Sequence, residues 1–290
     1  MSGSVSVSAR PVLFASTLSV HSDRALDRAC MIAKSLDARL LAVHAVDPGI
    51  LPEKYVLENV ARARAFLERE LADTVACDDV DRKIDIPLGK AEDAVVERAV
   101  ALGAGLIVVG TSRDTSLKAV LWGTRTEHLL RAAPCPVLLV KRRPRKPYRN
   151  IVVALDLEAA SRHALDFALR TFPDAQFTIL HAGGGSKRIA DRDAASIVED
   201  VVAARCIAVG HPLPEAKGGP DIVFLADSPA SVLYDEIVQL DTDLAVLGTH
   251  GRAGMPRLFI GSVAQTLSET LPCDILISRT PSIQEEKQSP

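Results

Sequence analysis

The second half of the chain repeats the first half at a spacing of 138 residues, and this repeat constrains the fold more than any other feature. Residues 106–110 (LIVVG) align with residues 244–248 (LAVLG). A unit of this length is far longer than a solenoid repeat and has the size of a domain. The sequence therefore predicts two tandem domains of one fold, at residues 1–143 and 148–282.

Short apolar runs alternate in each half with segments whose apolar residues follow helical spacing, as Leu26, Ala29 and Ala33 do. Parallel strands covered by helices on both faces are apolar throughout, and right-handed crossovers wind such a sheet in both directions. We expect an α/β fold with two doubly wound, five-stranded parallel sheets, one in each domain, related by pseudo-twofold symmetry. The expected strands are 12–15, 40–46, 83–87, 106–110, 137–141, 151–155, 177–181, 222–225, 244–247 and 275–278.

Charge and composition exclude several classes of partner. The formal net charge is -3 and the isoelectric point is about 6.2, which gives no overall attraction to nucleic acid or to an anionic membrane. We expect neither as a partner. Six of the nine residues 141–149 are basic and two are proline, which predicts an exposed interdomain linker. The N-terminus lacks a signal-peptide pattern and no apolar run could span a bilayer, so we expect a cytoplasmic protein.

The cysteines and histidines indicate structural roles. The five cysteines are scattered and include no C-x-x-C pair, so the sequence predicts neither a disulfide framework nor a zinc site. Cys135 and Cys273 occupy equivalent repeat positions and are expected to be small buried hydrophobic residues. His44 and His181 end equivalent strands, where we expect packed, hydrogen-bonded histidines rather than ligands. No metal site built from protein side chains is expected.

A glycine-rich segment follows the fourth expected strand of the second domain. It reads Gly248-Thr-His-Gly251, then nine residues, then Gly261-Ser262 at the expected start of a helix. Glycine lets backbone N–H groups close around an anion, and a helix N-terminus attracts one. In doubly wound sheets the ligand binds beyond the carboxyl ends of the strands where strand order reverses. If the first and fourth strands flank that point, Asp156 faces the glycines and can accept hydrogen bonds from a nucleoside, while the helix receives phosphate.

Each of these residues also has a structural interpretation. Glycines commonly end strands, and a serine such as Ser262 commonly caps a helix. The joint presence of Asp156 favours nucleotide binding in the second domain.

The first domain carries a damaged copy of the segment. It reads Gly110-Thr-Ser-Arg113, nine residues, Gly123-Thr124, and Thr17 stands where the second domain has Asp156. A non-glycine residue at positive φ costs roughly 1 kcal/mol or more, so the loop at Arg113 is expected to take another shape. We therefore expect nucleotide in the second domain only, with the first domain as scaffold or as a site for something else.

The pattern G-x-x-G, nine residues, G-[S/T], placed behind a strand, resembles the ATP-binding signature of the universal stress protein family. Val153-Ala-Leu-Asp156 resembles the family's first strand, and the likeness covers nearly the whole chain as two tandem domains. It implies a Rossmann-like fold of the adenine nucleotide alpha hydrolase type and a bound ATP, with or without Mg²⁺. It also implies that the two domains pair through their fifth strands as single-domain relatives dimerise, with a homodimer of the whole chain as a further option.

The resemblance and the loop chemistry give eight candidate binding residues in the second domain. Asp156 corresponds to the family's acid near base and ribose, and Ala182 lies near its adenine-contacting position. Arg252 could donate a charge-assisted hydrogen bond to phosphate, and Val263 could donate its backbone N–H. The remaining candidates correspond to the family's ribose and phosphate loop and are Gly248, Gly251, Gly261 and Ser262.

Motifs for catalysis do not accompany this site. The sequence contains no G-x-x-x-x-G-K-[ST], no G-x-S-x-G and no histidine pair at metal spacing, so we expect no enzyme, with a weak ATPase as the one exception. Two functions therefore stay open. One is a stress-response regulatory protein that binds ATP or a similar adenine nucleotide with little or no turnover. The other is a nucleotide-free interaction module that binds protein partners, or an apolar ligand in a pocket of the first domain.

Overall fold

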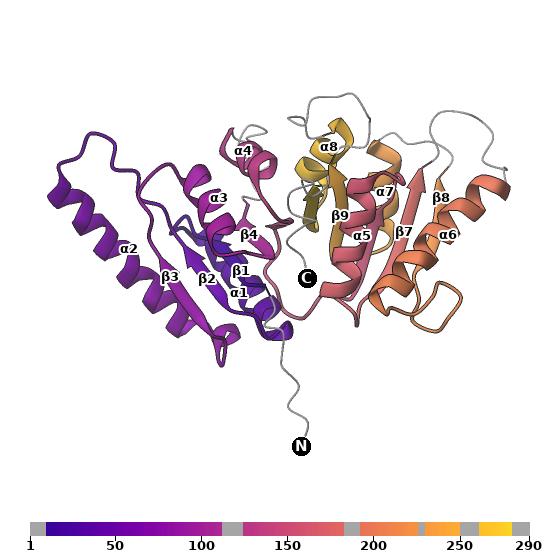
Figure 1. The fold of residues 1–290 in the computed structure, drawn as a ribbon, viewed down its shortest axis with the longest axis horizontal. Helices are drawn as coiled ribbons and strands as arrows, with labels where there is room; N and C mark the ends of the chain where they lie inside the picture. The colour runs from indigo at the N-terminus through magenta and orange to yellow at the C-terminus, as the bar shows by residue number, and fades with distance from the viewer. Residues whose placement is uncertain (1–9, 112–123, 183–191, 226–229, 250–260, 280–290) are drawn as a thin grey trace, which may run out of the picture. The chain divides into compact units, whose positions relative to one another are not determined.

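Two compact units, Met1–Arg145 and Lys146–Pro290, divide the chain. The structure is a computed structural model that describes residues 10–111, 124–182, 192–225, 230–249 and 261–279 (Figure 1). Each unit alternates strands with helices, and each contains one parallel sheet. This arrangement confirms the predicted α/β class.

The first unit has the strand order β3-β2-β1-β4-β5, with all neighbours parallel. Strand β1 pairs with both β2 and β4, so the strand order reverses between β1 and β4. Its elements are β1 (Val12–Ala15), α1 (Val20–Ser35), β2 (Leu40–Val43), α2 (Glu53–Asp73), the 3-10 helix η1 (Val75–Cys77), β3 (Arg82–Asp85), α3 (Ala91–Ala101), β4 (Leu106–Gly110), α4 (Thr124–Ala132) and β5 (Val137–Val140).

The second unit has the same topology, with the order β10-β9-β6-β7-β8. Helices α5 and α6 pack together on one face of this sheet, and α7 packs with α8 (Figure 1). Its elements are β6 (Asn150–Ala154), α5 (Ala159–Thr171), β7 (Gln176–Ala182), α6 (Arg192–Val209), β8 (Asp221–Leu225), α7 (Ala230–Gln239), β9 (Leu244–Thr249), α8 (Ser262–Thr270) and β10 (Asp274–Arg279).

Apolar side chains of the central strands form the core of each unit. Ile107 on β4 and Val246 on β9 are fully buried, as continuous burial of a two-sided sheet requires. Helix α1 turns Ala25, Ala29 and Ala33 inward, the helical spacing expected for a face that packs on a sheet. The prediction of apolar strands is wrong for β3, which reads Arg-Lys-Ile-Asp and exposes its first two residues. Strand β3 is the edge strand of its sheet and has a neighbour on one side only, and edge strands commonly carry exposed charged side chains.

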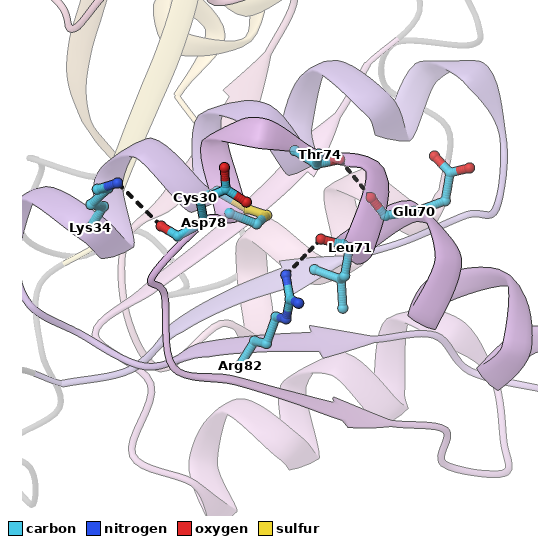
Figure 2. Close-up of a disulfide and its surroundings, with 8 residues drawn as sticks. Cys30, Lys34, Glu70, Leu71, Thr74, Asp78 and Arg82 are labelled. Carbon is cyan, nitrogen blue, oxygen red and sulfur yellow. Dashed lines mark hydrogen bonds between the residues drawn. A yellow bond between two sulfur atoms is a disulfide. The ribbon is translucent and has the colours of Figure 1, made fainter.

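A disulfide joins Cys30 on α1 to Cys77 in η1 (Figure 2). Both residues are buried, and Figure 2 shows the bond where α1 passes beside the end of α2. Close by, Arg82 on β3 donates through Nη1 to the carbonyl oxygen of Leu71 at 2.6 Å. The prediction that the cysteines form no disulfide is therefore wrong for this pair. The two cysteines are 47 residues apart and meet only because η1 folds back onto α1.

The segment between the units is less exposed than the sequence predicts. Lys141 is buried, and its carbonyl oxygen accepts a hydrogen bond from Arg24 Nη1 at 2.6 Å. Tyr148 is also buried and donates its hydroxyl to Asp274 Oδ2 at 2.6 Å. The exposed residues of the predicted linker are Arg143, Arg145, Lys146, Pro147 and Arg149. Lys141 and Tyr148 thus belong to the packing of their own units.

Of the three free cysteines, Cys206 and Cys273 are buried and Cys135 is half-buried. The prediction of a small buried hydrophobic residue is therefore confirmed for Cys273 and only in part for Cys135.

Candidate functional site

The carboxyl ends of β6 and β9 lie side by side, at the point where strand order reverses in the second unit. The two strands pair in register, with Ala154 opposite Leu247. The chain therefore leaves β6 toward Asp156 beside the place where β9 continues to Gly248. The predicted pairing of first and fourth strands is confirmed, and with it the shared edge of the sheet on which the candidate site depends.

Asp156 is held by the first turn of α5. Its Oδ1 accepts the hydroxyl of Ser161 at 2.5 Å and the backbone N–H of Glu158 at 3.0 Å. Leu157, between Asp156 and Glu158, has φ 65°, and this backbone conformation lets the chain turn sharply from strand to helix. Asp156 is exposed, and no hydrogen bond from the described residues reaches its Oδ2. One carboxylate oxygen is thus committed to the turn, and the other is available.

Gly248 is required by the packing of α5. A Cβ at this position would lie 2.6 Å from Ser161 Cα and 2.7 Å from the carbonyl carbon of Ala160. These are backbone atoms that cannot move aside. The resemblance assigned Gly248 to a loop that holds ribose and phosphate, and the structure gives a further reason for a glycine there, which is the close approach of the start of α5. The same Ser161 that holds Asp156 therefore also packs on Gly248, which links the two candidates.

Helix α8 begins at the third part of the candidate site. Gly261 is the N-cap residue, with φ -56° and ψ 143°, and no side chain caps the helix. Ser262 is therefore the first helical residue and not the cap. Ser262 and Val263 are exposed, and the first-turn N–H groups of a helix have no partner within it. Such an end attracts an anion.

The other candidates differ in what the structure shows of them. Ala182 is the last residue of β7 and is half-buried, one strand away from Asp156 across the sheet edge. Gly251 and Arg252 lie outside the described residues, so their place in the site stays a prediction.

The first unit keeps the framework of this turn without its charge. Thr17 Oγ1 hydrogen-bonds Ser22 Oγ at 2.8 Å, as Asp156 does with Ser161 in the second unit. Leu18 has φ 53°, matching the left-handed Leu157. The two turns therefore have the same local geometry, and they differ in whether a carboxylate stands at the strand end.

Equivalent histidines support both turns. His44 Nδ1 hydrogen-bonds the carbonyl oxygen of Ser16 at 2.9 Å, and His181 Nδ1 hydrogen-bonds that of Leu155 at 2.7 Å. A carbonyl oxygen only accepts, so Nδ1 carries the proton in both rings. The prediction of packed, hydrogen-bonded histidines is confirmed.

Sequence reasoning missed the two serines that organise the turns. Ser22 and Ser161 each stand five residues after the position of the acid. This regularity is visible once the halves are aligned, although a serine in the first turn of a helix has many ordinary uses.

Groups of acids, histidines and cysteines that could hold a metal ion are not found among the described residues. In the same ranges, no helix combines the length and the apolar character needed to cross a membrane.

Comparison with known proteins agrees with the fold and its duplication. The model of the universal stress protein family matches twice, at residues 8–141 and 147–279. The chain therefore belongs to the universal stress protein family, and it carries two of the family's domains in tandem.

Individual relatives show the same relationship. The Thermus aquaticus protein named "universal stress protein in QAH/OAS sulfhydrylase 3'region" is 33% identical over 135 residues, which are 46% of this chain and 98% of the relative. Universal stress protein E of Escherichia coli K12 is 22% identical over 209 residues, 66% of each chain. A crystal structure of a universal stress protein from Archaeoglobus fulgidus has a TM-score of 0.73 at 14% identity, covering 93% of this chain and 98% of that one. The last likeness concerns the fold alone.

Proposed function

We propose that this chain is a stress-response protein that binds ATP or a similar adenine nucleotide in its second domain, with little or no turnover. The observation that carries the proposal is Asp156. Its carboxylate is fixed at the strand-order reversal by Ser161, and its Oδ2 has no partner among the described residues. A fixed acceptor with one available oxygen suits the hydroxyl and amino donors of a nucleoside.

The start of α8 supplies the complementary half of the proposed site. Backbone N–H groups at Ser262 and Val263 and the positive end of the helix dipole suit phosphate. Gly261 leaves open space where a side chain would stand, so phosphate can approach the backbone there. In this proposal Gly251 and Arg252 complete the loop over the phosphates, and any Mg²⁺ enters with the nucleotide rather than on protein ligands.

The proposal is asymmetric because Thr17 replaces the acid in the first domain. A hydroxyl at that position already hydrogen-bonds Ser22 and Ser19, and it carries no charge. Nucleotide is therefore proposed for the second domain only.

The test combines co-purification with calorimetry. Small molecules released by heating the purified chain are identified by mass spectrometry, and ATP affinity is measured by titration calorimetry. Asp156→Ala is expected to weaken ATP binding about tenfold or more, since a hydrogen bond to a charged acceptor contributes about 1.5–3 kcal/mol. The matched variant Thr17→Ala changes the equivalent position of the other domain and is expected to leave the affinity unchanged.

Two results would contradict the proposal. One is a chain that neither carries nor binds an adenine nucleotide, which would favour the interaction module. The other is equal ATP affinity in Asp156→Ala and the parent. Phosphate release in the presence of Mg²⁺ tests turnover, which is expected to be at or near background.

A further inference from the structure

A pocket of about 380 Å³ lies in the first unit, between the carboxyl end of β2 and helix α2. Its lining comes from the β1–α1 turn at Leu18, from His44 and Val46 after β2, and from Arg62, Ala63 and Phe66 on α2. The volume falls within the roughly 300–1,000 Å³ of small-molecule sites. The pocket belongs to the domain in which the glycine-rich loop is damaged.

The inner part of the pocket is apolar. Val46 and Ala63 are buried and form a small core cluster with Val56, against which Leu18 packs. Phe66 stands at the pocket with 36% of its surface exposed, although it is a large hydrophobic side chain. An apolar ligand body would cover Phe66 and remove that surface from water, which is favourable at about 25 cal/mol per Å².

Arg62 supplies a cation at the rim. It is exposed, and within the described part of the chain its guanidinium makes no ion pair and donates no hydrogen bond. The nearby carboxylate of Asp47, which also lines the pocket, accepts the backbone N–H of Gly49 at 3.0 Å and so stabilises its own turn. A guanidinium presents paired donors in a plane that matches a carboxylate.

His44 fixes the polar part of the inner wall. Its Nδ1 donates to the carbonyl oxygen of Ser16, so Nε2 of the neutral ring is an acceptor. The pocket therefore combines apolar walls with the acceptor of His44, the amide of Asn59, the cation of Arg62 and the carboxylate of Asp47, which is held in its own turn.

These features suit a ligand other than a nucleotide. Thr17, at the position of the acid, is uncharged and hydrogen-bonded within its turn. The sequence places Arg113 where the second domain has Gly251. A triphosphate needs several converging donors, whereas this pocket offers one guanidinium and the amide of Asn59, beside the carboxylate of Asp47 and apolar walls.

We propose that the pocket between β2 and α2 binds a small amphiphilic monocarboxylate, with its apolar body between Val46, Ala63 and Phe66 and its carboxylate on Arg62. The first domain is then a binding domain in its own right. This inference stands apart from the nucleotide site, because it uses residues of the other unit.

Octanoate and octanol are the probes, and binding to the full chain is measured by titration calorimetry or ligand-observed NMR. Octanoate is expected to bind more tightly than octanol. Arg62→Gln is expected to weaken octanoate about tenfold, the order of a charge-assisted contact, and to change octanol less than about twofold, because the alcohol makes no ion pair.

Two further variants distinguish the contribution of the Arg62 charge from effects on packing and folding. Arg64→Gln makes the same charge change on an exposed residue of α2 outside the pocket lining, and it is expected to leave both affinities unchanged. Phe66→Ala is expected to weaken both probes together, since it removes apolar surface only. An unchanged thermal midpoint in each variant shows that the domain remains folded.

Three outcomes would overturn the proposal. The first is that octanoate does not bind, and the second is that Arg62→Gln and Arg64→Gln have equal affinity for octanoate. The third is that ATP competes with octanoate and that Arg62→Gln weakens ATP binding. Loss of ATP binding in Asp156→Ala with octanoate unaffected would support both proposals separately.

Discussion

Removing the disulfide between Cys30 and Cys77 should lower the stability of the first unit by about 4 kcal/mol. The bond closes a loop of 47 residues. In the chain-entropy model, a cross-link over a loop of this length restricts the unfolded chain by about 4 kcal/mol at 25 °C. Both cysteines are buried where η1 packs against α1.

Urea unfolding followed by tryptophan fluorescence gives the measurement. The chain contains one tryptophan, Trp122, within the sequence range of the first unit, and its fluorescence is expected to follow the unfolding of the domain that holds the disulfide. With a slope of about 2 kcal/mol per M, the loss of 4 kcal/mol lowers the urea midpoint by about 2 M. The variants are Cys30→Ala, Cys77→Ala and the double variant, each compared with the parent before and after reduction.

The variants separate the cross-link from the packing of two buried thiols. Either single variant should lose nearly the whole effect, the second substitution should add little, and reductant should lower the parent to a similar level. Cys206→Ala, which removes a buried free thiol from the other unit, should leave the tryptophan midpoint unchanged. Equal midpoints for the oxidised and reduced parent, or additive losses in the two single variants, would refute the reasoning.

Two further predictions concern the second unit. Gly248→Ala should destabilise it by about 1–3 kcal/mol in urea unfolding followed by circular dichroism, because the new Cβ meets the backbone of α5. Gly261→Ala, with open space at its Cβ, should cost less than about 1 kcal/mol, and equal losses would contradict the packing argument. Burial raises the pKa of Asp166 above its usual range, and Arg205 opposes the shift only in part. The folded state therefore binds the proton of Asp166 more tightly than the unfolded chain does. The stability that this proton contributes is complete below the usual pKa of an aspartate and is lost as pH rises through the raised pKa of the folded state. Asp166→Asn should therefore make the urea midpoint less dependent on pH over that range. An unchanged pH dependence of the midpoint would contradict the role given to Asp166.

The sheet was predictable because its residues repeat. Apolar runs such as Leu106–Gly110 occur twice with helical segments between them, and β4 has those bounds in the structure. The ligand rule for doubly wound sheets placed Asp156 and Gly248 at neighbouring strand ends on the condition that the first and fourth strands flank the reversal, and β6 and β9 do so.

The features that were missed depend on contacts across space. The disulfide joins Cys30 to a short 3-10 helix whose path the spacing of cysteines does not reveal. The polar strand β3 was assigned an apolar character because its neighbours have one, although an edge strand is covered less completely than a central strand and commonly carries exposed charged side chains. Lys141 and Tyr148 were assigned to an exposed linker because composition describes the average of a segment, and their burial depends on individual contacts.

The two strand-to-helix turns give the protein an internal reference. Asp156 with Ser161 and Thr17 with Ser22 are the same turn, built once with an ionisable group and once without. Any measurement that resolves both turns compares a charged and a neutral form in one sample, at one pH and one salt concentration. Thr17→Asp would place a carboxylate in both turns, and any difference that remained between the two turns would then come from their surroundings.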